Sequence, residues 1–404
     1  MNLRSGARSR PAALPGRLAL ALGLAVVAGC ALQPAAERGG SAGPGASGLE
    51  YRVYVANESS DLVSRIAFSR GAGARVEREI PVGIMPADTD GPHGVLVSPD
   101  SRFLYVTVAH GTPDGWLWKF RAGADTLIGR TELGRFPATL SSTPDGRLLV
   151  VANFDLHGDP EPSSVSVVFA PELAELSRIT TCMTPHGSRI AASGRFHYSV
   201  CMRSDQLVEL SLATFGVTRR MSLQPGSEGP LSADDAGPAS APDPAAPSCA
   251  PTWVSPGAGG RADRLVYVTC SARAEVLEVE TGGWRIARRL AAGPGPYNIA
   301  VTPDGGRLLV TLRSGGGVSV IGLDAGEETA RLATTESFTH GVVVSPDGRY
   351  AFVTNESVGA TPGTLDVFDL SSLELAASVE LRHQPGGIAF WRTDPVGEGP
   401  GAEG

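Results

Sequence analysis

Residues 340–355, HGVVVSPDGRYAFVTN, contain a short apolar run, a tight turn and a second apolar run. In the turn SPDG at 345–348, Pro restricts φ, Asp bonds to the nearby backbone and Gly accepts a positive φ. Two further runs with alternating apolar residues follow at 364–369 and 375–381. This stretch therefore predicts a unit of four short antiparallel strands.

The same order of elements recurs along the chain. Seven strand starts carry Pro, or Thr339 in its place, followed by one variable residue and an apolar run; they begin at Pro92, Pro137, Pro185, Pro251, Pro296, Thr339 and Pro385. Successive starts are 45, 48, 66, 45, 43 and 46 residues apart. A repeat of this length that is built from strands indicates a β-propeller with four antiparallel strands in each blade.

The two ends of the repeat array complement each other. The last first strand, expected at 387–390, has no room after it for three more strands, whereas strands at 52–57, 62–68 and 76–82 lack a first strand. Together they make one blade, and this closure removes an exposed sheet edge. The sequence thus predicts an all-β, seven-bladed propeller over residues 51–393, closed by N-terminal strands that complete the C-terminal blade.

These units resemble the YVTN-repeat family of secreted and lipoprotein seven-bladed β-propellers. The best matches are residues 340–355 and 92–108 (PHGVLVSPDSRFLYVTV), and the resemblance covers about residues 51–391. It implies the fold but no particular activity, because this architecture carries many functions. The chain is also similar, more distantly, to lactonase propellers, methylamine dehydrogenase heavy chains and the copper propeller of nitrous oxide reductase.

The first thirty residues indicate export. Four Arg precede an apolar run at 18–28, which is too short for a comfortable membrane span. The run ends in VAGC at 27–30, which resembles the lipobox of bacterial lipoproteins. The resemblance implies that 1–29 is a signal peptide and that Cys30 is the lipid-modified first residue of the mature protein; an ordinary secretory signal with a chance Cys is the alternative. Because Ala31 follows Cys30, we expect an outer-membrane or cell-surface lipoprotein with a periplasmic or extracellular domain.

Three segments have too few bulky apolar residues to build a core. We expect a flexible tether at 30–50, a disordered insertion at 225–248 that explains the long step of 66 residues, and a disordered tail at 394–404. The net charge is −8, without the basic footprint that nucleic acid binding requires. We expect a monomer that contacts the membrane through its lipid anchor only.

Candidate ligand-binding residues meet on one face of the predicted ring. First strands begin, and second strands end, on the same face, because strand direction alternates within a blade. Three of the seven histidines, His93, His186 and His340, occupy the variable position after Pro or Thr339. The other candidates occupy the same position in further blades, or lie at or near second-strand ends: Thr252, Tyr297, His110, Arg313, Glu58 and Glu356. We expect them to line the mouth of the central channel.

The cysteines follow the same rule. Cys182 and Cys249 precede the first strands of neighbouring blades, and Cys201 and Cys270 end the second strands of those blades. Four thiols in an exported domain predict two disulfides, of which Cys182–Cys201 and Cys249–Cys270 are favoured while an inter-blade pairing stays open.

A metal site is the alternative for these residues. Soft sulfur beside imidazole suits copper, and His93, His186 and His340 could hold zinc or copper. The three histidines come from separate blades across a wide channel, however, and export favours disulfides. No cofactor is therefore expected, with copper or zinc at the three histidines left open.

Two functions remain. The first is a binding module for a small ligand or a protein partner, through the channel-mouth face. The second is a propeller enzyme, either a lactonase-like hydrolase or a copper- or other metal-dependent redox protein, that uses His93, His186 and His340. The chain has no P-loop, GxSxG or HExxH motif, which favours the first. An enzyme would need a positioned base with an orienting partner, whereas a scaffold would show a flatter face without perturbed acids or bases.

Overall fold

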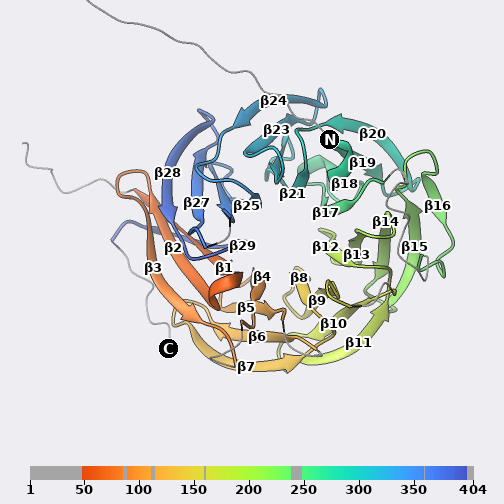
Figure 1. Cartoon of the computed structure of the whole chain (residues 1–404), viewed down its shortest axis with the longest axis horizontal. Helices are drawn as coiled ribbons and strands as arrows, with labels where there is room; N and C mark the ends of the chain where they lie inside the picture. The colour runs from red at the N-terminus through yellow and green to blue at the C-terminus, as the bar shows by residue number, and fades with distance from the viewer. Residues whose placement is uncertain are drawn as a thin grey trace, which may run out of the picture. The chain divides into compact units, whose positions relative to one another are not determined.

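The computed structural model describes residues 48–84, 89–110, 114–158, 161–237, 248–358 and 360–397, all within one compact unit, Ser47–Gly404. These residues form seven antiparallel sheets arranged in a ring (Figure 1). The predicted seven-bladed all-β propeller is confirmed. The signal peptide, Cys30, most of the tether and the end of the tail lie outside the described residues.

Blades 1 to 6 follow the chain order, and blade 7 joins its two ends. The innermost strands, which lie nearest the axis in Figure 1, are β4 (Pro92–Val97), β8 (Pro137–Ser142), β12 (Pro185–Ile190), β17 (Pro251–Pro256), β21 (Pro296–Val301), β25 (Thr339–Val344) and β29 (Pro385–Pro395). The second strands are β5 (Phe103–Val108), β9 (Leu148–Asn153), β13 (Phe196–Cys201), β18 (Leu265–Cys270), β22 (Arg307–Leu312), β26 (Tyr350–Asn355) and, in blade 7, β1 (Leu49–Asn57). Each innermost strand begins at the residue that the repeat predicted.

The outer half of each blade contains the third and fourth strands. The third strands are β6 (Trp116–Arg121), β10 (Ser164–Phe169), β14 (Gln206–Ser211), β19 (Glu275–Glu280), β23 (Val318–Gly322), β27 (Thr364–Asp369) and β2 (Leu62–Ser69). The fourth strands are β7 (Thr126–Glu132), β11 (Ala174–Thr180), β15 (Gly216–Ser222), β20 (Arg285–Ala291), β24 (Glu327–Leu332), β28 (Glu374–Glu380) and β3 (Gly73–Pro81). Three short 3₁₀ turns are η1 (Glu58–Ser60), η2 (Gly259–Arg261) and η3 (Ser271–Arg273).

Ring closure occurs in the sheet β29-β1-β2-β3, as predicted. Strand β1 pairs with β29 over most of its length, so the two ends of the chain complete one blade. Arg52 of β1 is 1 % exposed and forms ion pairs with Glu50, with Glu77 of β3 and with Asp394 of β29. A buried cation with several carboxylate partners ties three strands of this blade together.

The blades pack through apolar side chains on their facing sheets. Between blades 6 and 7, the ring of Tyr350 lies edge-on to those of Tyr51 and Phe68, with centroids 5.0 and 4.9 Å apart. Such clusters recur between neighbouring blades, so each blade buries both faces of its sheet. The result is a rigid ring that holds the strand starts near one axis.

The insertion in blade 3 differs in part from the expectation of a segment without structure. Part of the insertion forms strand β16 (Gly229–Leu231), which pairs with β15 and is the fifth strand of this sheet. Glu228 forms an ion pair with Arg289 of blade 4, with a nitrogen–oxygen distance of 2.6 Å. The expectation was wrong here because backbone pairing with an open sheet edge needs little apolar side-chain surface. Residues 238–247 of the insertion lie outside the described residues.

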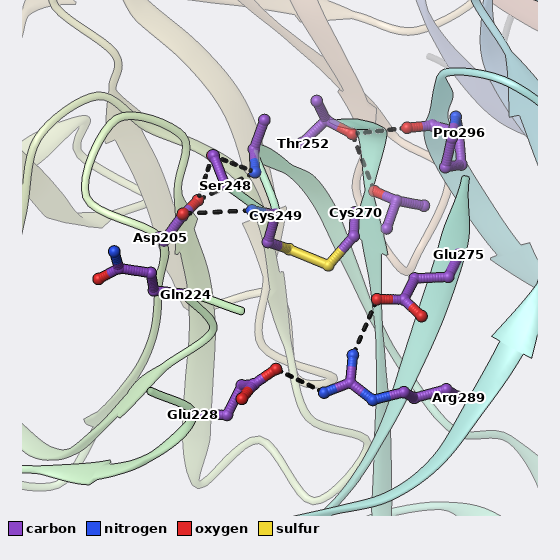
Figure 2. Close-up of a disulfide and its surroundings, with 12 residues drawn as sticks. Asp205, Gln224, Glu228, Ser248, Cys249, Thr252, Cys270, Glu275, Arg289 and Pro296 are labelled. Atoms are coloured by element: carbon purple, nitrogen blue, oxygen red, sulfur yellow. Dashed lines mark hydrogen bonds and ion pairs between the residues drawn. A yellow bond between two sulfur atoms is a disulfide. The ribbon is translucent and has the colours of Figure 1, made fainter. Parts of the chain in front are cut away.

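Both favoured disulfides are present, Cys182–Cys201 in blade 3 and Cys249–Cys270 in blade 4. Figure 2 shows the second one beside Asp205, whose carboxylate accepts hydrogen bonds from the backbone N–H groups of Cys249 and Ala250. The bonds fix the chain where it leaves the insertion and enters blade 4. Over the described part of the chain, no helix has the length and hydropathy of a membrane span.

Candidate functional site

The geometry of the strand starts brings the variable positions together. The residue after the variable position is Gly in blades 1, 3, 6 and 7, and each lies against the backbone of the next blade. A Cβ on Gly94 would lie 2.2 Å from the oxygen of Ala138, and one on Gly341 would lie 2.5 Å from that of Gly386. Only Gly permits this close approach, which draws the innermost strands tightly around the axis.

Three histidines meet near the axis, as the sequence predicted. The ring centroid of His93 lies 5.9 Å from that of His186 and 6.1 Å from that of His340. Tyr297 lies between the last two, at 5.7 Å from His186 and 4.7 Å from His340. We call these four residues, together with Trp253, the hub.

Trp253 was not among the predicted site residues. Its ring lies 5.3 Å from that of His186 and 6.3 Å from that of His340. It takes the place that Gly occupies in blades 1, 3, 6 and 7, and this substitution at the strand start is the signal that could have identified it. The hub is therefore filled by aromatic and imidazole rings.

Glu58 links the hub to the more exposed edge of the site. This side chain, which is 9 % exposed, contacts Nδ1 of His93 and Nε2 of His110, both at 2.9 Å, and accepts a bond of 3.2 Å from the amide of Gln384. Burial alone would raise the pKa of Glu58, but the two imidazoles hold it well below its usual range. In turn, Glu58 outweighs the effect of burial and raises the pKa of His93. The group is an anion between two histidines.

A second carboxylate, Glu356, lies beside His340 of the hub. Glu356 accepts a bond of 2.6 Å from Nη2 of Arg313, and its other oxygen is 3.5 Å from Nε2 of His340. Burial raises the pKa of Glu356 to about 7, although Arg313 opposes the shift. Burial and the nearby Arg313 lower the pKa of His340 well below its usual value. Glu356 is thus a buried carboxyl group that changes its charge near neutral pH.

His186 has a structural role besides its place in the hub. Its Nδ1 donates a bond of 2.9 Å to the backbone oxygen of Thr252 in blade 4, and its Nε2 is 3.4 Å from the hydroxyl of Tyr297. Burial lowers the pKa of His186 to about 3, so the ring is neutral at physiological pH. The Thr252 hydroxyl bonds to Thr269 and to the backbone of blade 5, so the structure does not bring it into the ring cluster.

Solvent reaches the site at its rim. The side chains of Arg313 and His110 are 36 % and 30 % exposed, whereas those of His93, Glu356 and His340 are 11 % or less. The guanidinium of Arg313 lies over the ring of Tyr297, 4.9 Å from its centroid. An incoming ligand would therefore meet Arg313 and His110 first, with the two carboxylates and His93 beneath them.

The structure excludes one of the two metal sites considered, the one with cysteine ligands, and leaves the one at the three histidines untested. The disulfides remove the four cysteines as thiolate ligands, so a sulfur-ligated metal site at these residues is wrong. Among the described residues, no three His, Cys, Asp or Glu side chains already stand in a metal-binding arrangement. Two ring nitrogens of the three central histidines, Nε2 of His93 and Nδ1 of His340, are buried without a hydrogen-bond partner in the described part of the chain. Copper or zinc at the three histidines stays a prediction.

No protein-family model and no curated protein sequence matches this chain. Solved structures do match in fold. A periplasmic gluconolactonase of Pseudomonas aeruginosa is 16 % identical, with a TM-score of 0.63 over 85 % of this chain and 99 % of that one. A candidate 6-phosphogluconolactonase of Bacteroides fragilis is 15 % identical, with a TM-score of 0.63 over 87 % of this chain and 99 % of that one. Hydrazine synthase of Kuenenia stuttgartiensis is 18 % identical, with a TM-score of 0.53 over 72 % and 81 %. At these identities the likeness concerns the propeller fold alone.

Proposed function

We propose that this protein is an exported, lipid-anchored β-propeller that binds a small polar ligand at the face where its innermost strands begin. One observation carries the proposal: two buried carboxylates, Glu58 and Glu356, flank the hub, and each is held by basic partners. Buried ionic groups that converge on one place are costly to assemble and are typical of binding and catalytic sites.

The chemistry of the site favours a ligand with both acceptor and hydroxyl groups. Arg313 offers a charged donor and the imidazole of His93 a further nitrogen, while Glu58 and Glu356 offer acceptors. A sugar acid or its lactone carries the matching carboxylate or carbonyl oxygen and several hydroxyl groups. Two of the similar folds also belong to proteins with lactonase in their names.

Gluconate and glucono-lactone are the probes for this proposal. We expect either to raise the melting temperature of the wild-type protein and to lose at least tenfold in affinity in Arg313→Gln. The matched control is Arg285→Gln, which removes an exposed Arg–Glu pair on the outer strand β20. Equal shifts in both variants, or no shift with any sugar acid, would count against the ligand class; a stable complex with a protein at this face would favour the other kind of partner.

Lactone hydrolysis is the second candidate, and the raised pKa of Glu356 favours it. A carboxylate that titrates near neutrality can accept a proton from water as the water oxygen bonds to the lactone carbonyl carbon. The ring carbon–oxygen bond then breaks, the leaving oxygen takes up the proton, and the product is a hydroxy acid. We expect glucono-lactone opening above the spontaneous rate, a limb of kcat/KM that rises with pH around 7, and loss of that limb in Glu356→Gln. If the protein binds the lactone but does not open it, the hydrolase is ruled out and the binding function alone is supported.

The proposed export and lipid anchoring can be tested separately from ligand binding. The two disulfides fit an extracytoplasmic domain, and we propose that a lipid attached to Cys30 anchors it. We expect the wild-type protein to partition into the detergent phase and to carry acyl chains on its N-terminal peptide, and Cys30→Ser to lose both. An aqueous, unmodified wild-type protein would indicate an ordinary secretory signal instead.

A further inference from the structure

A pocket lies between blades 1 and 2 at the end of the molecule opposite to the hub. The turns that join innermost to second strands line its edge, with Pro99 and Asp100 from blade 1 and Pro144 and Asp145 from blade 2. Its volume is about 590 Å³, which is in the range of small-molecule sites. It is separate from the site proposed above, because the innermost strands run from the hub face to these turns.

The only lysine of the chain, Lys119, lines this pocket. Lys119 is 4 % exposed, and its Nζ donates bonds of 2.9 and 3.2 Å to the backbone oxygens of Ala170 and Pro171. Among the described residues it has no ion pair with a carboxylate. Lysines are seldom buried unless their charge is paired, whereas the direct partners of this ammonium group are two neutral carbonyl oxygens.

Further cations surround the same aromatic wall. The ring of Phe103 faces Nζ of Lys119 at 4.3 Å and the guanidinium carbons of Arg121 and Arg102 at 5.3 and 5.4 Å. Arg147 lines the pocket from blade 2. The charged residues that line the pocket balance in number, two basic (Lys119, Arg147) and two acidic (Asp100, Asp145). Arg102 and Arg121 beside Phe103 add positive charge next to it.

The two acidic residues of the pocket form no ion pair with Lys119 within the described part of the chain. An oxygen of Asp100 accepts bonds from the Ser98 hydroxyl and the Arg102 backbone N–H, and Asp145 is held in the same way by the turn of blade 2. Their positions are thus set by turn chemistry. Burial lowers the pKa of Lys119, Arg121 acts in the same direction, and Asp100 opposes both.

The neighbouring pocket offers an internal comparison. A cavity of about 450 Å³ lies between blades 2 and 3 and is lined by the equivalent turns, with Phe196 and Leu212. Its one basic lining residue is Arg195, and no lysine or other buried cation lies in its wall among the described residues. The two pockets have similar turns, so the buried ammonium group is what distinguishes the first.

We propose that the pocket between blades 1 and 2 binds a small flat organic anion, with Lys119 and Arg147 holding the charged group and Phe103 and Tyr105 contacting the ring. The anion would be the direct ion-pair partner of Lys119, and the aromatic and proline side chains would cover its apolar part.

Pyridoxal phosphate is the probe, because it combines a flat ring, a phosphate and an aldehyde. The aldehyde condenses with a neutral lysine amine to an imine with loss of water, and borohydride reduces the imine to a stable secondary amine. Since Lys119 is the only lysine, peptide mass spectrometry separates its label from that on the N-terminal amine. We expect saturable labelling of Lys119, at least tenfold stronger than with pyridoxal, which lacks the phosphate, and suppressed by inorganic phosphate.

Arg147→Gln should weaken this labelling several-fold without unfolding the protein, because Arg147 is exposed. The control is Arg195→Gln, which alters the neighbouring pocket in the equivalent turn and should leave the labelling unchanged. Label only on the N-terminal amine, or equal labelling by pyridoxal and its phosphate, would overturn the proposal. So would an unchanged result in Arg147→Gln, since the lysine would then be reactive without an anion site around it.

Discussion

At the scale of single residues, His197 of β13 is the clearest conflict between side chain and surroundings. It is fully buried, and neither ring nitrogen has a hydrogen-bond partner in the described part of the chain. The equivalent second position of the other second strands is apolar, as in Leu104, Leu149 and Val266. Burial lowers the pKa of His197 to about 3, so the ring stays neutral in the folded state.

We predict that His197→Leu stabilises the protein, and more so in acid. At pH 7 the gain should be about 1–3 kcal/mol, since two unsatisfied polar atoms leave the core. Below pH 6.5 the unfolded wild-type chain binds a proton that the folded one does not, so wild-type stability falls as pH drops toward 3 and the gain grows by about 1.4 kcal/mol per pH unit. Urea unfolding of both proteins at pH 7 and pH 5 measures the gain; a variant that is less stable at both would contradict the prediction.

Glu356 should give the opposite pH dependence. Its folded pKa of about 7 exceeds the unfolded value of a Glu, so its contribution to stability is fully present below pH 4 and is lost as pH rises through 7. We predict that Glu356→Gln gains on the wild type by about 2–3 kcal/mol between pH 4.5 and pH 7.5. Equilibrium unfolding across this range tests it, with the more exposed Glu280→Gln as the control; parallel curves for wild type and Glu356→Gln would contradict the assigned shift.

The site illustrates what residue types alone can and cannot predict. The shared face of His93, His186 and His340 followed from strand direction, which a repeat reveals. The bridge from Glu58 to His93 and His110 joins blades 7 and 1 and depends on side-chain distances across a junction that is remote in sequence. The same holds for Trp253, because no local pattern tells which way a ring turns.

At the scale of elements, a threonine hydroxyl links neighbouring blades. Thr354, the fifth residue of β26, accepts a bond of 2.8 Å from the N–H of Gly341 and donates one of 2.8 Å to the oxygen of Gly386 in blade 7. Thr107 and Thr311 make the same pair of contacts in blades 1 and 5. The threonine of the repeat therefore has an inter-blade role. Blade 3 has Val200 at this position, and there the junction is made by His186 and the backbone of Thr252.

We predict that Thr354→Val costs about 1–3 kcal/mol, because a buried N–H and a buried carbonyl oxygen both lose their partner while the shape is kept. Thr354→Ser should recover most of this stability. Thermal unfolding measures both variants, with Thr126→Val on the exposed outer strand β7 as the control. If Thr354→Val melts with the wild type, the hydroxyl does not stabilise the junction.

The elements were predictable wherever the signal was local. Pro at a strand start and the SPDG turn act through their own backbone preferences, so the innermost strands began where expected. The disulfide pairing followed because β12 and β17 each begin opposite the cysteine that ends the next strand. Strand β16 was missed, since Gly229–Leu231 has no alternating pattern and pairs only because β15 offers an edge.

At the scale of the whole molecule, the closing blade should decide whether the ring forms. We predict that a chain ending before Pro385 fails to fold cooperatively, because β1 loses its partner and Arg52 loses Asp394. A chain ending after Gly397, which keeps all of β29, should melt as the full chain does. Circular dichroism melting curves compare the two; a sharp transition in the shorter chain would mean that six blades and a three-stranded sheet suffice.

Closure by β29 also sets a time order for the life of this chain. Of the strands described, β29 is synthesised last and β1 first, so β1 keeps an unpaired edge until β29 has been made. Until then that edge is open to pairing with another copy of the chain, so the interval between making β1 and making β29 is when misassembly is most favoured.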